Sequence, residues 1–399
     1  MSHTGQRASL PREHLERIQA ALRARGLAGW LLYDFRGVNP IAGAVLGLTD
    51  PLSRRYAAWL PADGAPTVIA HAIELAPWSD FPGTVRVYHR WEEWEREMGA
   101  LVRGREKIAL EYAPRGALPT VDRVPGGVVD LLRAHGAELV GSGDLVTLFR
   151  ARWSAADLDH HRRAAAVLAP VARAAFEHAA SGRAAGERLT EWDLKGWILE
   201  RLHAEGLHDA DTTVACGPNS ADPHYEPVAD RHAAIEPEHV LLIDLWARTD
   251  PMTVFADQTW MGYTGPRPPA DVLDVWRAVR DARDRALAVL RERIAKGPRP
   301  RGCDVDRAAR ALLEERGYAD AFVHRTGHSI DRELHGSGPN LDSLETEDTR
   351  TLEPEIGFSV EPGVYLRGRF GIRSEVNVAL TADGIEVNPP SPQTEMWTT

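Results

Sequence analysis

The chain of 399 residues is 43 % hydrophobic and 26 % charged, and at about 150 residues per domain this length predicts two or three domains. Its 47 Lys and Arg against 58 Asp and Glu leave a formal net charge of −11. This charge argues against nucleic acid and anionic membranes as partners, because both attract positive groups. No uncharged apolar run approaches the roughly 18 residues of a membrane span. The two isolated cysteines, Cys216 and Cys303, exclude a disulfide framework or a Cys-based zinc site and fit a cytoplasmic protein.

The first 150 residues predict a mixed α/β domain. Ser9, Pro11 and Gly26 suit the cap, first turn and stop of a helix over residues 9–26. Residues 61–64, Pro-Ala-Asp-Gly, have the chemistry of a hairpin turn, since Gly tolerates positive φ. The expected strands are 30–35, 56–60, 67–71, 85–88 and 107–112, with a helix over 92–102. We place this domain at residues 1–152.

Residues 153–399 predict a second domain in which one pattern occurs twice. Each copy begins with a long helix and a shorter one, and Thr190 with Asp193 caps the first short helix. The expected helices are 153–178, 190–202, 271–295 and 304–316, and the expected strands are 212–216, 239–246, 253–260, 321–324, 357–360 and 371–380. This order predicts an α+β fold with a pseudo-twofold repeat.

Four acidic residues lie inside segments that read as buried strand, where an unpaired carboxylate resists leaving water; they are Asp244, Asp257, Glu361 and Glu375. For any one of them, a buried salt bridge is the simpler interpretation. Four together would repel one another unless cations intervene, and two divalent metals would balance their charge. Such oxygen-rich coordination suits Mn, with Co or Zn when a histidine joins. Strand alternation also places Arg373, Glu375 and Asn377 on one face.

Residues 324–335 contain three histidines, His324, His328 and His335. Any one of them alone is more simply a hydrogen-bonded core or surface residue. Gly327 lets the backbone beside His328 approach a ligand closely. A serine-hydrolase interpretation of Gly327-His328-Ser329 fails, because the nucleophile elbow needs a glycine where this chain has Asp331.

The ordered set Asp, Asp, His, Glu, Glu resembles the metal-dependent superfamily of aminopeptidase P, prolidase and methionine aminopeptidase, whose pita-bread domain binds two metals. The matching stretches are Ile243-Asp244, Phe255-Ala256-Asp257, 324–335, Val360-Glu361-Pro362-Gly363-Val364-Tyr365 and Gly371-Ile372-Arg373-Ser374-Glu375. The resemblance covers about residues 155–390. The preceding part is similar in size and kind to that of creatinases, prolidases and aminopeptidases P.

The resemblance implies a role for each matching residue. Asp257 and Glu375 would bridge two divalent ions, Asp244 would bind one ion, and His328 with Glu361 would bind the other. Glu361 would also be the general base. The implied catalytic and substrate-binding residues are His224, His335, His324 and Arg373. This chain departs from the family pattern at Trp246, Ser329, Asp331 and Gly336.

The leading functional hypothesis is an Xaa-Pro dipeptidase (prolidase) that cleaves small peptides and, from the resemblance, forms a homodimer. A dipeptidase must recognise a free carboxylate, for which Arg373, His335 or Arg36 are candidates, although Arg36 is more simply a solvated loop residue. The alternatives are an Xaa-Pro aminopeptidase, a creatinase-like hydrolase and a non-catalytic binding protein of the same fold. The full set of five ligands argues against the last two.

Overall fold

A computed structural model describes residues 7–398. The chain divides into two compact units, Met1–Arg150 and Ala151–Thr399. Each unit has its own sheets and core. Within the described part of the chain, no helix is long and apolar enough to cross a membrane.

The N-terminal unit is a six-stranded mixed sheet in the order β4-β3-β2-β1-β5-β6. Strands β1, β2 and β3 pair antiparallel, and the remaining pairs are parallel. Its strands are β1 (Gly29–Asp34), β2 (Tyr56–Pro61), β3 (Thr67–His71), β4 (Thr84–Tyr88), β5 (Ile108–Leu110) and β6 (Leu139–Gly141). Its helices are α1 (Arg12–Ala24), α2 (Pro40–Val45), α3 (Trp91–Val102), α4 (Gly126–Ala134) and α5 (Gly143–Phe149), with 3-10 turns η1 (Ala76–Trp78) and η2 (Pro114–Gly116).

Alternation along β1 divides the core of this unit into two faces. Trp30 and Leu32 pack with α1, α2 and α5, whereas Leu31 and Tyr33 pack with α3 and α4. Because successive side chains of a strand point to opposite faces, a strand buried on both sides carries an unbroken apolar run.

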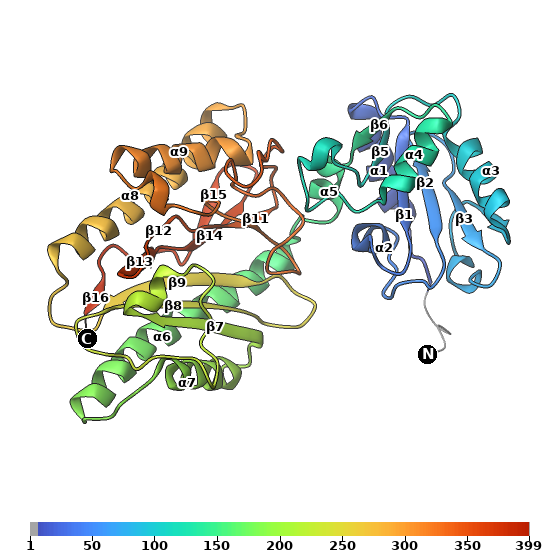
Figure 1. Ribbon diagram of the computed structural model, residues 1–399. Helices are drawn as coiled ribbons and strands as arrows, with labels where there is room; N and C mark the ends of the chain where they lie inside the picture. The colour runs from blue at the N-terminus through green and yellow to red at the C-terminus, as the bar shows by residue number, and fades with distance from the viewer. Residues whose placement is uncertain (1–6, 399) are drawn as a thin grey trace. The chain divides into compact units, whose positions relative to one another are not determined.

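The C-terminal unit repeats the order helix, helix, strands (Figure 1). The first half contains α6 (Ala155–Ala184), α7 (Glu191–Ala204), β7 (His208–Cys216), η3 (Gly217–Ala221), β8 (Val240–Arg248) and β9 (Ala256–Tyr263). The second half contains α8 (Ala270–Lys296), α9 (Gly302–Glu315), η4 (Ala319–Ala321), β10 (Ser329–Ile330), β11 (Gly357–Val360), β12 (Gly363–Leu366), β13 (Phe370–Arg373), β14 (Val376–Leu380), β15 (Ile385–Asn388) and β16 (Trp397–Thr398).

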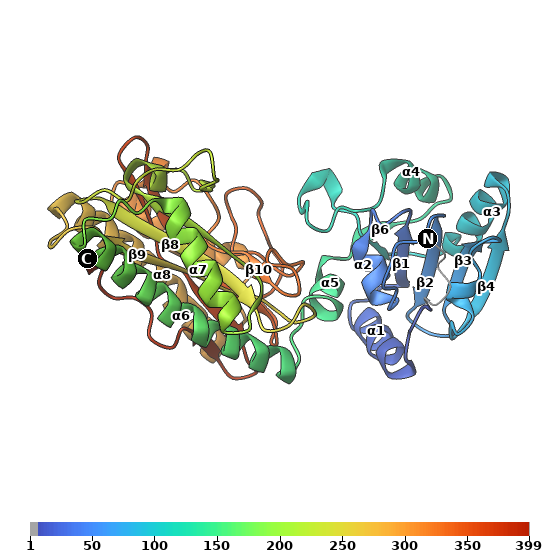
Figure 2. The same ribbon diagram turned by 90° about the horizontal axis from the view of Figure 1, so that it is seen from below.

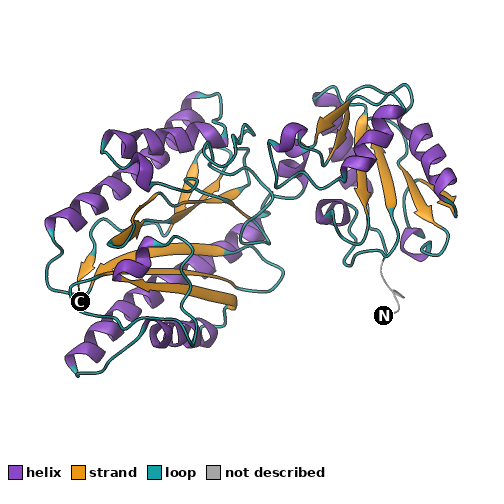
Figure 3. Ribbon diagram, in the orientation of Figure 1, coloured by secondary structure: helices purple, strands orange, loops and turns teal. Residues whose placement is uncertain are grey.

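Two four-stranded sheets form the centre of this unit, in the orders β16-β9-β8-β7 and β10-β11-β14-β15, with the hairpin β12-β13 beside them. Helices α6 and α7 pack on the outer face of the first sheet, and α8 and α9 are packed in the core cluster that covers the second. Figure 2 shows α6 and α7 lying along β8 and β9, and Figure 3 shows the strands enclosed between the two helix pairs. This arrangement confirms the predicted α+β fold with its repeat of helix, helix and strands, and the strands form two sheets.

The inner face of the first sheet changes along its length from apolar to polar. The strand register places three residues side by side in each successive row across β7, β8 and β9. The rows are Ala215, Leu242 and Met261, then Thr213, Asp244 and Thr259, then Asp211, Trp246 and Asp257. The first row belongs to the hydrophobic core, and the other two therefore mark where the interior becomes a polar site.

Three details of the expected secondary structure are wrong. Helix α1 begins at Arg12 with Pro11 in the N-cap position, so Ser9 does not cap it. Residues 321–324 form no strand; η4 ends at Ala321, and the chain then runs as a loop to β10. The expected strand over 371–380 is interrupted at Ser374 and Glu375, where β13 ends in one sheet and β14 begins in another. Each half-strand takes its hydrogen bonds from a different partner, β12 or β11, and sequence alternation alone does not reveal that change of partner.

Candidate metal centre and catalytic pocket

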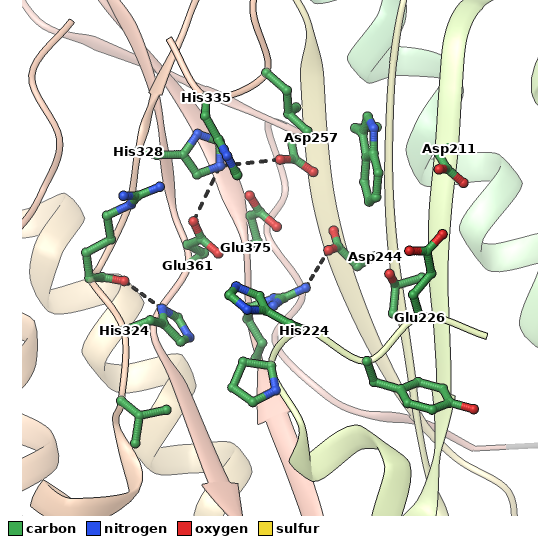
Figure 4. A pocket seen from close by; sticks show the side chains of 18 of the residues that line it. Asp211, His224, Glu226, Asp244, Asp257, His324, His328, His335, Glu361 and Glu375 are labelled. Carbon is green, nitrogen blue, oxygen red and sulfur yellow. Dashed lines mark hydrogen bonds and ion pairs between the residues drawn. The ribbon is translucent and has the colours of Figure 1, made fainter. Parts of the chain in front are cut away.

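A cavity of about 800 Å³ opens at the polar end of the first sheet. Its walls come from β7, β8, β9, β13, the loop around His224 and the segment from Val323 to His335. All nine site residues expected from the sequence line this cavity, and Figure 4 shows most of them from close by: Asp244, Asp257, His328, Glu361, Glu375, His224, His324, His335 and Arg373.

Three of these side chains form a compact group of metal-binding type. Ligand atoms of Asp257, His328 and Glu375 all lie within 4.8 Å of one another, and all three residues are buried. His328 Nε2 is 3.5 Å from Asp257 Oδ2 and also 3.5 Å from Glu361 Oε1 (Figure 4). The structure therefore brings an imidazole and three carboxylates from four separate chain segments to one point.

Two carboxylate oxygens of this group have no hydrogen-bond partner among the described residues. They are Asp257 Oδ1 and Glu375 Oε1, and both are fully buried. Buried polar atoms in folded proteins nearly always have partners, and a buried carboxylate without one is costly. Carboxylate oxygens with one imidazole are the donor set of Mn, Co or Zn sites. The residues present thus fit a divalent metal centre.

The raised pKa values of two carboxyls in the cavity also indicate a site for cations. Burial raises the pKa of Asp244 to about 7; Arg373 opposes this shift and Asp257 adds to it. Burial, followed by repulsion from Asp257, holds the pKa of Glu375 well above its ordinary range. Burial and mutual repulsion therefore disfavour the ionised forms of these carboxyls. Divalent cations bound between them would offset the repulsion and favour ionisation.

His328 and Glu361 stabilise each other's charged forms. Burial opposes protonation of His328, but Asp257 and Glu361 outweigh it and raise the pKa of the imidazole. Burial likewise opposes ionisation of Glu361, yet His328 and other positive neighbours hold its pKa below the ordinary range. Ser359 on β11 links the two, since its hydroxyl donates to Glu361 Oε1 at 3.0 Å and accepts from the His328 backbone N–H at 2.9 Å.

The guanidinium of Arg373 pairs with the carboxylate of Asp244. Its Nε donates to Thr259 Oγ1 at 2.9 Å. Thr259 in turn contacts Glu375 Oε2 at 2.8 Å and Asp244 Oδ1 at 3.2 Å. Arg373 therefore compensates charge and orients carboxylates at the wall of the cavity.

Helix α9 anchors the segment that carries the histidines. Asp306, which is fully buried, accepts from Thr326 N at 2.9 Å and from Thr326 Oγ1 at 2.6 Å. Its neighbour one turn later, Arg310, donates to the His324 carbonyl at 2.9 Å. His324 Nε2 lies 2.8 Å from the Tyr365 hydroxyl. These contacts fix the segment that immediately precedes His328.

His224 and His335 lie at the more open side of the cavity. The His335 ring is edge-on to His328, with centroids 4.3 Å apart. His224 is exposed, and its backbone N–H donates to Asp222 Oδ1 at 3.0 Å. Arg36 belongs to the N-terminal unit, where its guanidinium packs over the Phe35 ring.

Sequence reasoning missed several residues that line the same cavity. Arg325 adjoins His324, and within the described residues its guanidinium forms no hydrogen bond or ion pair. Trp246 follows Asp244 by two positions, so strand alternation could have placed it on the same face of the sheet as Asp244. Asp211 had no such signal, because its place depends on the register between β7 and β8.

Known proteins resemble this chain in both sequence and fold. A model of metallopeptidase family M24 matches residues 159–382. Probable dipeptidase PepE of Mycobacterium tuberculosis is 29 % identical over 376 residues, 92 % of each chain. An Xaa-Pro dipeptidase of Lactobacillus delbrueckii subsp. lactis is 28 % identical over 176 residues, 44 % of each chain. The crystal structure of dipeptidase PepE from Mycobacterium ulcerans matches with a TM-score of 0.71 at 25 % identity, covering 97 % of each chain.

The family match spans more than half of the chain and includes every residue of the candidate metal group. The family is one of hydrolases that use divalent metal ions, and the donor set described above fits that requirement. Its pita-bread fold is the fold of the C-terminal unit. The chain belongs to metallopeptidase family M24.

Proposed function

We propose that this protein is an Xaa-Pro dipeptidase that uses two divalent metal ions per chain. The observation that carries the proposal is the buried group of Asp257, His328 and Glu375, which lines a cavity of substrate size and contains two unpartnered carboxylate oxygens. Asp244 and Glu361 line the same cavity and complete a set of five ligands.

The four carboxylates carry four negative charges, which two divalent ions balance. Asp257 and Glu375 would be shared between the ions, Asp244 would hold one ion, and His328 with Glu361 would hold the other. When bound, divalent cations lower the pKa of a water molecule and polarise the carbonyl that it attacks.

Glu361 is the proposed general base. Its Oε1 accepts the Ser359 hydroxyl at 3.0 Å, which leaves Oε2 to take a proton from the attacking water and pass it to the leaving nitrogen. The low pKa of Glu361 keeps the carboxyl ionised and ready to accept. His335, beside His328, would donate a hydrogen bond to the carbonyl oxygen as negative charge develops there.

Recognition of a free carboxylate separates a dipeptidase from an aminopeptidase. Because Arg373 is occupied by Asp244, Arg325 is the better candidate for this role. A guanidinium matches a carboxylate with two parallel hydrogen bonds. His224 and His324 would border the same end of the peptide. The named Xaa-Pro dipeptidase among the relatives supports proline as the second residue.

The test is a substrate panel on metal-loaded protein, with Ala-Pro, Ala-Ala, Ala-Pro-amide and Ala-Pro-Ala. The proposal predicts the highest kcat/KM for Ala-Pro. Equal values for Ala-Pro and Ala-Pro-Ala would instead indicate an aminopeptidase. Glu361→Gln should lower kcat for Ala-Pro by about 10²-fold or more, the usual effect of losing a general base, whereas the exposed control Glu200→Gln should not.

A further inference from the structure

One row of the inner sheet face contains two residues, Asp211 and Trp246, that have no part in the proposed chemistry. Asp211 on β7 is directly opposite Trp246 on β8, and Trp246 is directly opposite Asp257 on β9. All three residues line the cavity. Neighbouring strands lie about 4.8 Å apart, so Asp211 is two strand spacings from the metal-binding Asp257. The indole of Trp246 occupies the interval between them.

This side of the cavity carries excess negative charge. Lys195 on α7 lies 2.9 Å from Asp211 Oδ1 and 3.3 Å from Glu226 Oε1. One ammonium group therefore pairs with two carboxylates. The side chain of Asp211 is 42 % exposed and that of Glu226 is 58 % exposed, whereas that of Lys195 is only 8 % exposed. In Figure 4, Asp211 and Glu226 lie to the right of Asp257 and Glu375, and His324 and His328 lie to the left.

The acidic side belongs to the same cavity as the buried, unpartnered oxygens of Asp257 and Glu375. A ligand held at those oxygens can therefore extend over Trp246 towards Asp211. The strand register places Asp257, Trp246 and Asp211 in one row, and all three line the cavity.

We propose that Trp246 and Asp211 form the subsite for the N-terminal side chain of the substrate and select a long basic residue there. This inference rests on the proposed dipeptidase function. The α-ammonium of a dipeptide is bonded to the carbon beside the scissile carbonyl, so it stays close to the metal group. A lysine ammonium is carried on a flexible four-carbon stem, and it can cross the indole to reach Asp211 and Glu226.

Both the indole of Trp246 and the carboxylate of Asp211 suit a lysine or arginine side chain. Lysine and arginine bury their methylene stems on apolar surfaces while the charged head stays in water. The face of an indole also attracts cations. The exposed carboxylates of Asp211 and Glu226 then meet the head group, where an acidic side chain would be repelled.

The test compares Lys-Pro with norleucyl-Pro, which has the same stem without the ammonium, and with Glu-Pro. We expect kcat/KM for Lys-Pro to exceed that for norleucyl-Pro by about tenfold, the ratio that one charged contact of about 1.4 kcal/mol produces. Asp211→Asn should bring this ratio close to one, and Glu226→Gln should lower it in the same direction. Trp246→Leu should lower the ratio as well. The exposed control Asp230→Asn should keep the wild-type ratio.

A parallel measurement needs no turnover. Calorimetric titration of lysinamide and norleucinamide into the metal-loaded protein should show about tenfold tighter binding of lysinamide, and Asp211→Asn should abolish the difference. Equal binding of the two amides, or an unchanged ratio in Asp211→Asn and Glu226→Gln, would overturn the subsite. If no Xaa-Pro dipeptide is hydrolysed but lysinamide still binds selectively, the proposed function fails and the subsite stands.

Discussion

The guanidinium of Arg373 is held against the carboxylate of Asp244 at the wall of the candidate catalytic cavity. The two residues come from different sheets of the unit, on β13 and β8. Thr259 joins them through hydrogen bonds to both side chains. Arg373 therefore supports the proposed metal ligands, and under the proposed function the free carboxylate of the substrate needs another partner.

Replacement of Arg373 by Gln should damage hydrolysis of all substrates to a similar extent. Removing one partner of a buried ion pair costs about 3–5 kcal/mol, and here it leaves Asp244 without its compensating charge. We expect kcat/KM to fall at least about 100-fold for both Ala-Pro and Ala-Pro-amide. The exposed residue Arg367 provides a control of equal charge change. A loss restricted to Ala-Pro would show that Arg373 binds the substrate carboxylate after all.

Replacement of Arg325 by Gln should instead impair mainly the hydrolysis of substrates with a free carboxylate. A hydrogen bond to a charged group contributes about 1.5–3 kcal/mol, so KM for Ala-Pro should rise by about 10- to 100-fold with kcat little changed. Hydrolysis of Ala-Pro-amide, which lacks the carboxylate, should change much less. Steady-state kinetics on the two substrates measures both effects, and equal losses would exclude Arg325 as the carboxylate partner.

The candidate metal ligands were easier to recognise in the sequence than the contacts that support them. Asp244, Asp257, Glu361 and Glu375 were identifiable because charged residues are unusual in apolar strands. The alternation of Arg373 and Glu375 also indicated a shared polar face, although the chain changes sheets between them. The pairing of Arg373 with Asp244 was not predictable, because it depends on how the two sheets face each other.

The contacts of Asp306 were also not predictable from the sequence. It lies in a helix with ordinary amphipathic spacing, where an acidic residue normally faces solvent. Its burial and its bonds to Thr326 and Ser343 arise only when α9 packs beside the histidine segment. Sequence spacing places residues on one helix face, but it does not say which loop packs there.

Asp306→Asn should weaken metal binding although Asp306 is not itself a ligand. The amide would present N–H groups to Thr326 and Ser343, whose N–H and O–H groups are donors in this contact. Loss of supporting contacts around metal ligands typically lowers metal affinity about 10- to 100-fold. Competition with a fluorescent chelator measures this affinity, with the exposed Asp320→Asn as control. Unchanged affinity would show that the His328 turn holds its shape without α9.

His161 should make the protein sensitive to mild acid. Its ring is fully buried against Trp153, and burial lowers its pKa to about 4. The unfolded chain, with a histidine pKa of about 6.5, takes up the proton first as the pH falls. Stability is therefore retained above about pH 6.5 and lost progressively down to about pH 4, by up to about 3 kcal/mol from this group.

Urea unfolding between pH 7 and pH 4.5 tests this expectation. In His161→Phe the free energy of unfolding should decline less with acid than in the wild type, whereas the exposed control His203→Gln should follow the wild type. Identical pH dependence in His161→Phe and the wild type would mean that the buried imidazole is already protonated in the folded protein.

The most direct test of the account is a metal titration of chelator-treated protein, with Ala-Pro hydrolysis and bound metal followed together. We predict no activity in the stripped protein and recovery with Mn²⁺ that is complete at two ions per chain. We also predict that Asp257→Asn, which removes a shared ligand, neither binds two ions tightly nor recovers. Full Ala-Pro hydrolysis by the stripped protein, or none at any metal content, would contradict a dinuclear Xaa-Pro dipeptidase.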